Sequence, residues 1–207
     1  MNGASESIPA SQPPVIQIVG YKNSGKTTLI TELLRLWAAE GTRVAVIKHD
    51  AHQFQMDHRG TDTFAHTEAG AAAVAITSPT RTAIIREQSS TLQQLVAELS
   101  SSSIDSYDLI LVEGFKQEPY PKVALMARES DLPLLEQLTG LHWIYTRLQP
   151  EEWTTLLSGN ENNNEPAMQT PGETLNLKEK PIIPAGKDGI MELFVALNAY
   201  IMSYAKH

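Results

Sequence analysis

The chain has 207 residues, of which 42% are hydrophobic and 19% charged, the size and composition of one ordinary globular α/β domain. The formal net charge of −8 argues against broadly anionic partners, so we expect binding neither to nucleic acid nor to a membrane surface. The sequence contains no cysteine, which excludes disulfides, iron–sulfur ligation and thiol catalysis and suits a reducing cytoplasm.

The start of the chain differs in character from the rest. Residues 1–14 have neither the basic start nor the apolar centre of a secretory signal, and we expect a disordered leader there. No later apolar run approaches the ~18 residues of a transmembrane helix. We therefore expect a cytoplasmic protein with a single domain over residues 15–207.

The most informative stretch follows an apolar run at residues 15–19 (VIQIV), which predicts a buried strand. Residues 20–27 (GYKNSGKT) fit the pattern G-x-x-x-x-G-K-[ST], and an amphipathic helix is predicted from Lys26 onward. Glycines let the backbone approach an anion closely, the Lys26 ammonium reaches terminal phosphates, and the Thr27 hydroxyl is suited to Mg²⁺. The order of strand, loop and helix predicts a phosphate-binding loop for a nucleoside triphosphate or diphosphate.

A second strand is predicted over residues 43–48 (RVAVIK), and Asp50 follows its carboxyl end. Ligands of open α/β sheets bind at that edge, so Asp50 is a candidate for positioning the attacking water or a water of the Mg²⁺ shell. Histidines are frequent after the end of this strand, which raises the alternative of a transition-metal site. These histidines are His49, His52, His58 and His66.

The next part of the chain predicts a short helix and a hairpin. Thr61 or Asp62 is suited to cap a helix within residues 57–70. Residues 71–77 and 81–86 are two strand candidates around a tight bend. A further helix is predicted from Ser90 to about Leu99.

That helix has Gln93 three residues after Ser90, the spacing of a capping box.

The apolar run at residues 107–113 (YDLILVE) predicts a strand that ends in Glu113. In phosphate-loop proteins an acidic residue at the end of such a strand holds Mg²⁺. We therefore assign Glu113 to the metal site, and Gly114 allows close approach to the γ-phosphate.

Residues 114–122 form either a binding loop or a proline-stiffened connector, and the spacing favours neither. Strands predicted at 122–127 and 141–146 complete the expected set. The last one runs into Thr146-Arg147-Leu148-Gln149, which lacks the acidic residue of the guanine-reading [NT]-K-x-D motif. The residues alone leave ATP and GTP open.

Residues 158–180 are rich in Asn, Glu, Pro and Gly, and we expect a mobile excursion there. An amphipathic helix is predicted from Ile190 to Tyr204. Near-continuous apolar strands alternating with helices predict an α/β fold of the phosphate-loop NTPase type, with a mostly parallel β-sheet covered by helices on both faces.

Three stretches resemble the MobB family of nucleotide-binding adaptors in molybdopterin-guanine dinucleotide biosynthesis. They lie at residues 20–29 (GYKNSGKTTL), 46–71 and 108–125 (DLILVEGFKQEPYPKVAL), within about the first 60% of the chain. The resemblance implies GTP with Mg²⁺, weak GTP hydrolysis at most, and a homodimer. It also implies partnership with the guanylyltransferase that joins GMP to molybdopterin or its molybdenum form.

The resemblance also assigns individual residues. It assigns Mg²⁺ to Thr27 and Glu113, with Asp50 as a further candidate. The residues that it assigns to the phosphates are Gly20, Asn23, Ser24, Gly25, Lys26, Thr27 and Thr28.

The resulting hypothesis is a GTP-binding adaptor rather than the transferase itself. Hydrolysis is expected to be slow because no glutamine or arginine is obviously placed for the transition state. If a dimer mate supplies an arginine to the transition state, Arg59 and Arg81 are the candidates. The alternatives are a small-molecule kinase and a GTP-dependent metal chaperone that uses the histidines of residues 49–66.

Overall fold

The computed structural model describes residues 12–50, 55–101, 106–159, 169–170, 173–174 and 177–204. It divides into two compact units, one built from residues up to His49 and from Leu95 onward, the other from Asp50–Gln94. The first unit holds the phosphate loop. Whether both units act as one domain remains a prediction.

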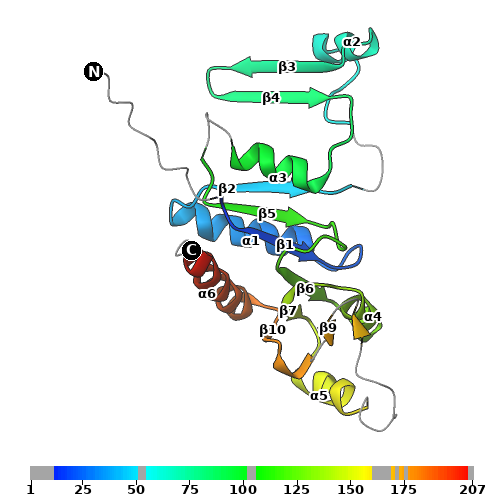
Figure 1. Cartoon of the computed structure of the whole chain (residues 1–207), viewed down its shortest axis with the longest axis vertical. Coiled ribbons are helices and arrows are strands. Elements are labelled where there is room, and N and C mark those ends of the chain that lie inside the picture. Colours follow the sequence, from blue (N-terminus) through cyan, green and yellow to red (C-terminus); the bar gives the residue numbers. More distant parts are fainter. Residues whose placement is uncertain are drawn as a thin grey trace, which may run out of the picture. The chain divides into compact units, whose positions relative to one another are not determined.

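The first unit is built on a six-stranded sheet in the order β10-β7-β6-β1-β5-β2, in which every pairing is parallel (Figure 1). Its strands are β1 (Val15–Val19), β2 (Val44–Lys48), β5 (Leu109–Glu113), β6 (Lys122–Met126), β7 (Leu141–Thr146) and β10 (Ile182–Pro184). Since β1 lies between β6 and β5, the loop that follows it emerges at the middle of the sheet.

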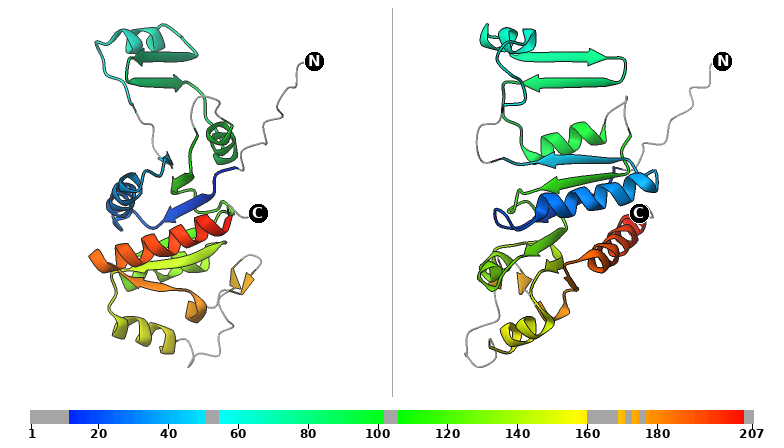
Figure 2. Two further views of the ribbon diagram at one scale, coloured as in Figure 1. Left: turned by 90° about the vertical axis from the view of Figure 1, so that its left-hand side faces the viewer. Right: turned by 180° about the vertical axis from the view of Figure 1, so that it is seen from behind.

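Helices cover both faces of this sheet, as predicted (Figures 1 and 2). On one face α1 (Lys26–Ala39) and α6 (Lys187–Tyr204) pack on the sheet, and on the other lie α4 (Leu132–Glu136) and α5 (Pro150–Gly159). Alternate residues of each strand serve the two faces, since Ile18 belongs to the first core and Val19 to the second.

The core between α1 and α6 has a polar contact within it. Trp37 of α1 is fully buried, with its ring centroid 5.7 Å from that of Phe194 in α6. Its indole Nε1 donates to Asn198 Oδ1 at 2.8 Å. The apolar face predicted for α1 is therefore the face that binds the C-terminal helix.

The second unit contains α2 (Asp62–Glu68) and the antiparallel pair β3 (Ala73–Ser78) and β4 (Arg81–Arg86). Thr61 caps α2, its hydroxyl accepting from the Phe64 amide at 3.2 Å, which confirms one of the two caps considered. The predicted hairpin is also confirmed. Helix α3 (Leu92–Ser100) crosses the boundary between the units.

Two expectations about the helices and strands were wrong. The capping box of α3 is formed by Thr91 and Gln94, each side chain bonding the other's backbone amide, and lies one residue beyond the Ser90–Gln93 pair. The set of strands was also incomplete, because β10 was missed. Its three residues are too few to show a pattern, and it is a strand through its pairing with β7.

The segment 158–180 contains more structure than expected. It includes the end of α5, the short antiparallel pair β8 (Gln169–Thr170) and β9 (Glu173–Thr174), and a 3₁₀ turn, η2 (Leu177–Glu179). Another 3₁₀ turn, η1 (Glu129–Asp131), precedes α4. Residues 1–11 and 160–168 lie outside the described residues, so the disordered leader and the mobile excursion remain predictions.

In the described part of the chain, no helix combines the length and apolarity needed to cross a membrane.

Candidate functional site

The phosphate loop connects β1 to α1 and has the backbone that its glycines predict. Gly25 has φ +102° and is the N-cap of α1, so it has no side chain with which to bond the first-turn amides. Asn23 also has a positive φ of 64°, a conformation that asparagine tolerates better than most residues. The amides at the start of α1 are thus directed to the carboxyl edge of the sheet, where an anion is favoured.

Gly20 permits the tight approach of this loop to the sheet. A Cβ at Gly20 would lie 2.6 Å from Ser24 Oγ and 3.2 Å from Leu125, so no larger residue fits without movement. Ser24 is buried, and its hydroxyl has no hydrogen-bond partner among the described residues.

Lys26 is held inside the loop. Its Nζ donates to the carbonyl oxygens of Gly20 at 3.1 Å and Tyr21 at 2.7 Å. Burial lowers the pKa of Lys26, and the nearby Glu113 carboxylate opposes that shift. An anionic ligand would favour the charged ammonium in the same way.

Thr27 and Glu113 lie together although 86 positions separate them in the chain. The Thr27 hydroxyl donates to Glu113 Oε1 at 3.5 Å, because β1 and β5 are adjacent parallel strands that end at the same edge. The sequence predicted this pair. A hydroxyl and a carboxylate are hard oxygen donors, the ligand type that Mg²⁺ prefers.

These residues line a cavity of about 530 Å³, here called the phosphate cavity. Its walls carry four cationic side chains and one carboxylate, Glu113, in a protein whose net charge is −8. The cations are Lys22, Lys26, Lys48 and Arg147. Such a concentration of positive charge matches a polyphosphate ligand.

Most predicted phosphate residues line this cavity, while two lie beside it. Asn23, Gly25, Thr27 and Thr28 are in its wall with Lys26. Gly20 supplies the close turn and Ser24 faces a neighbouring cavity. Asp50 belongs to the second unit, so its part in the site remains a prediction.

The chain after β5 approaches the phosphate loop. Phe115, at the unusual φ of 52°, packs against the ring of His49, with 4.6 Å between the ring centroids. The Lys116 ammonium lies 4.4 Å from the ring centroid of Tyr21, a residue of the loop at residues 20–27. This brings one end of residues 114–122 to the nucleotide edge, while the docking role considered for it remains open.

The histidines do not form a metal centre in the described residues, where no group of three or more His, Cys, Asp or Glu side chains suits a metal ion. His52 belongs to residues 51–54, which lie outside the described part of the chain.

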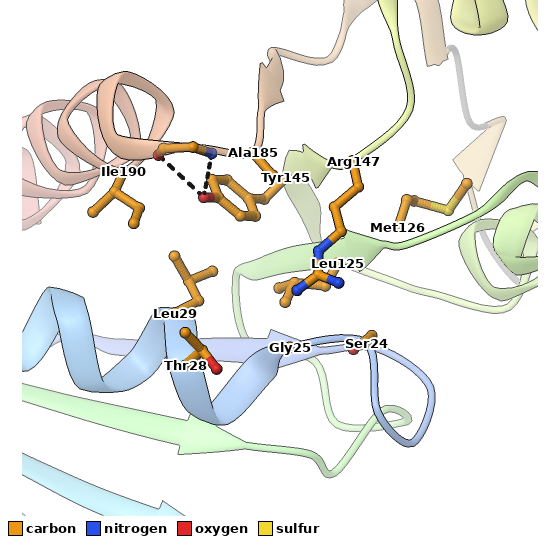
Figure 3. A pocket seen from close by; sticks show the side chains of 11 residues that line it. Ser24, Gly25, Thr28, Leu29, Leu125, Met126, Tyr145, Arg147, Ala185 and Ile190 are labelled. Atoms are coloured by element: carbon orange, nitrogen blue, oxygen red, sulfur yellow. Dashed lines mark hydrogen bonds between the residues drawn. The ribbon is translucent and has the colours of Figure 1, made fainter.

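Arg147 was missed as a site residue. It follows β7 and lines both the phosphate cavity and the neighbouring one, and Figure 3 shows it in the wall of the neighbouring cavity. The signal was present, because Arg147 occupies the position at which the guanine-reading motif has its lysine. The motif is incomplete, because Gln149 stands where its acidic residue would be.

The parallel sheet, the loop after its central strand and the helix behind that loop define the phosphate-loop class of α/β proteins. Within this class, the family model of MobB, described as molybdopterin guanine dinucleotide synthesis protein B, matches residues 15–144. The chain belongs to the MobB family.

Individual relatives agree with this assignment. The molybdopterin-guanine dinucleotide biosynthesis adapter protein of Haemophilus influenzae is 41% identical over 128 residues, 61% of this chain and 70% of the relative. A probable adapter protein of the same name from Bacillus subtilis is 31% identical over 136 residues, 65% and 77% of the two chains.

Among solved structures, the MobB protein homologue of Bacillus stearothermophilus has a TM-score of 0.61 and 26% identity, covering 91% of this chain and 98% of that one. The family assignment favours the adaptor hypothesis over the metal chaperone and the small-molecule kinase.

Proposed function

We propose that this chain is a GTP-binding adapter protein that assists the attachment of GMP to molybdopterin. The observation that carries the proposal is the phosphate cavity, where the helix start, Lys26 and three further cations surround one carboxylate. Membership of the MobB family supports the adapter role. The guanylyltransferase and molybdopterin, free or with molybdenum, are the proposed partners, in the cytoplasm.

The binding chemistry follows from the loop. The first-turn amides of α1 and the Lys26 ammonium bind the terminal phosphates, and Lys22 and Lys48 add positive charge. Thr27 and Glu113 would hold Mg²⁺, with Asp50 as a third candidate. The ion would neutralise charge on the phosphates.

We propose slow hydrolysis, because the described walls of the phosphate cavity contain no glutamine to position a water. Arg147 is the arginine of these walls, and it lies over Gly25. Arg59 and Arg81 remain candidates from a second subunit.

A homodimer is part of the proposal, and the hairpin of the second unit supports it. Ile76 of β3 and Ile84 of β4 are 56% and 57% exposed. Ile76 is paired with Ala83 and Ile84 with Ala75, so the two isoleucines point to opposite faces. A two-stranded sheet is marginal alone, so association with a second copy would stabilise it.

Nucleotide titrations with and without Mg²⁺ test the central part of this proposal. We expect GTP to bind the wild type more tightly than ATP, and Lys26→Ala to lose at least about tenfold in GTP affinity because a charge-assisted contact is removed. Lys180→Ala, which alters a lysine outside both cavities, is the control and should bind normally. Unchanged affinity in Lys26→Ala would refute the phosphate-loop assignment.

The metal-chaperone alternative has its own test. Equilibrium dialysis with nickel or zinc should show no tight binding that depends on His49 and His52. Stoichiometric binding lost in the double variant His49→Ala/His52→Ala would revive that alternative.

A further inference from the structure

A second cavity of about 350 Å³ adjoins the phosphate loop in the first unit (Figure 3). Its walls are largely aliphatic, with Leu29 of α1 facing Ile190 of α6 and Leu125 of β6 near them. A flat apolar ligand suits such walls, and this volume lies within the range of small-molecule sites. We call it the side cavity.

The far wall of the side cavity is fixed by hydrogen bonds. The Tyr145 hydroxyl accepts from the Gly186 amide at 3.1 Å and donates to the Gly186 carbonyl at 3.4 Å. The Ala185 amide donates to the Thr146 carbonyl at 2.5 Å. The side cavity therefore has a preformed shape, set by the ends of β7 and β10.

Arg147 stands between the two cavities and lines both. Its Nη2 lies 2.8 Å from the point that a Cβ on Gly25 would occupy, so the guanidinium is directly against the phosphate loop. Thr28, at the start of α1, is also shared by the two cavities. A ligand with phosphates in one cavity can place its remaining part in the other.

We propose that the side cavity takes the purine base of the nucleotide and that Arg147 reads guanine through its O6 and N7 atoms. The inference rests on the proposed function, because it assumes a nucleotide at the phosphate loop.

The chemistry of the walls favours this mode of reading. No side chain that the structure describes around the side cavity is acidic, so no carboxylate is present to accept from guanine N1–H and the 2-amino group. Arg147 offers donors only, which match the two acceptors O6 and N7 of guanine. Adenine turns an amino group toward the same donors, and its binding is disfavoured.

Ser24 provides a second polar group at this place. It lines the side cavity, and its buried hydroxyl is without a hydrogen-bond partner in the described residues. Buried polar groups are normally satisfied, so a polar atom of a nucleotide is a suitable partner.

The test compares GTP, inosine triphosphate, ATP and 7-deaza-GTP on the wild type. Inosine keeps O6 and N7 but lacks the 2-amino group, so we expect it to bind within about twofold of GTP. ATP and 7-deaza-GTP, each lacking one of the two acceptors, should bind at least about tenfold more weakly. Inosine triphosphate binding tenfold more weakly than GTP would overturn the proposal.

Variants supply the second arm. Arg147→Ala should bring GTP affinity to that of ATP, whereas Arg35→Ala, which removes an exposed arginine bonded to Glu32, should keep the preference. A guanine preference that persists in folded Arg147→Ala would overturn this inference and leave the proposed function intact. A wild type that binds none of these nucleotides would refute the proposed function itself. The nucleotide series needs no variant, so it decides even if Arg147→Ala does not fold.

Discussion

At the scale of single residues, the phosphate loop depends on backbone conformations that few side chains tolerate. Gly25 has φ +102°, and a Cβ there would meet Arg147 Nη2 at 2.8 Å. Gly41, after α1, has φ +78° but nothing within 4 Å of such a Cβ. The two glycines share the conformational constraint and differ in their surroundings.

This contrast leads to the first prediction. Gly25→Ala and Gly41→Ala should each lower the free energy of unfolding by about 1–2 kcal/mol, the cost of a left-handed conformation. Only Gly25→Ala should also weaken GTP binding, by at least about tenfold, because its methyl group displaces Arg147 and crowds the anion site. Urea denaturation and nucleotide titration of both variants give the comparison. Equal GTP affinities for the two would contradict it.

Lys122 is a residue-scale feature outside the nucleotide site. It is fully buried at the start of β6, where its Nζ donates to the carbonyls of Glu118 and Tyr120. Burial lowers its pKa from 10.5 to about 8. Between these values the unfolded chain binds more protons than the folded one, so the contribution of Lys122 to stability rises with pH.

We therefore predict a pH-dependent difference between the wild type and Lys122→Met. Below pH 8 both states of the wild type hold the proton, and the difference in unfolding free energy should be constant. From about pH 8 to 10.5 the wild type should gain stability relative to the variant. Denaturation curves across this range measure it, and a pH-independent difference would show that Lys122 titrates normally.

At the scale of elements, β1 and the end of β5 are joined by a buried side chain. Gln17, at the centre of β1, is fully buried and donates through Nε2 to the carbonyls of Gly114 at 3.0 Å and Phe115 at 2.8 Å. These residues directly follow Glu113. Gln17 thus fixes the backbone that positions the candidate Mg²⁺ ligand.

Gln17→Leu should lower the free energy of unfolding by about 1–3 kcal/mol, since two carbonyls lose their donor. We also expect Mg²⁺ to enhance GTP binding less than in the wild type, because the backbone after Glu113 is released. Gln137→Leu, at the exposed C-cap of α4, is the matched control. A stability loss without any change in the Mg²⁺ effect would limit Gln17 to a structural role.

The sequence predicted the elements whose signals are local. The loop at residues 20–27 is one continuous motif, and the pairing of Thr27 with Glu113 follows from the rule that parallel strands end at one edge. The approach of Arg147 to Gly25 and the Gln17 contacts could not be predicted in this way. They arise when segments far apart in the sequence meet, and β10, which completes the side cavity, is too short to show a pattern.

At the scale of the whole molecule, the proposed dimer depends on the second unit, in which β3 and β4 pair only with each other among the described strands. Each strand therefore presents an edge, and each face carries an exposed isoleucine. Such edges and faces are commonly covered by another chain.

We predict a mass in solution of about twice the 22.8 kDa of one chain. Ile76→Lys should shift it toward the monomer, because burying an unpaired charge in an interface is unfavourable. Val195→Lys, at a residue of α6 that is 63% exposed, should remain dimeric. Light scattering after size exclusion measures the masses. A wild type that is monomeric at tens of micromolar would exclude the dimer.

The central claim is that bound GTP makes this chain an effective adapter, and one measurement tests it most directly. The rate at which the guanylyltransferase joins GMP to molybdopterin is measured alone, with the wild-type chain, and with folded Lys26→Ala. We predict a faster transfer with the wild type and no enhancement with Lys26→Ala. An equal enhancement by both chains, or none by the wild type, would contradict the claim.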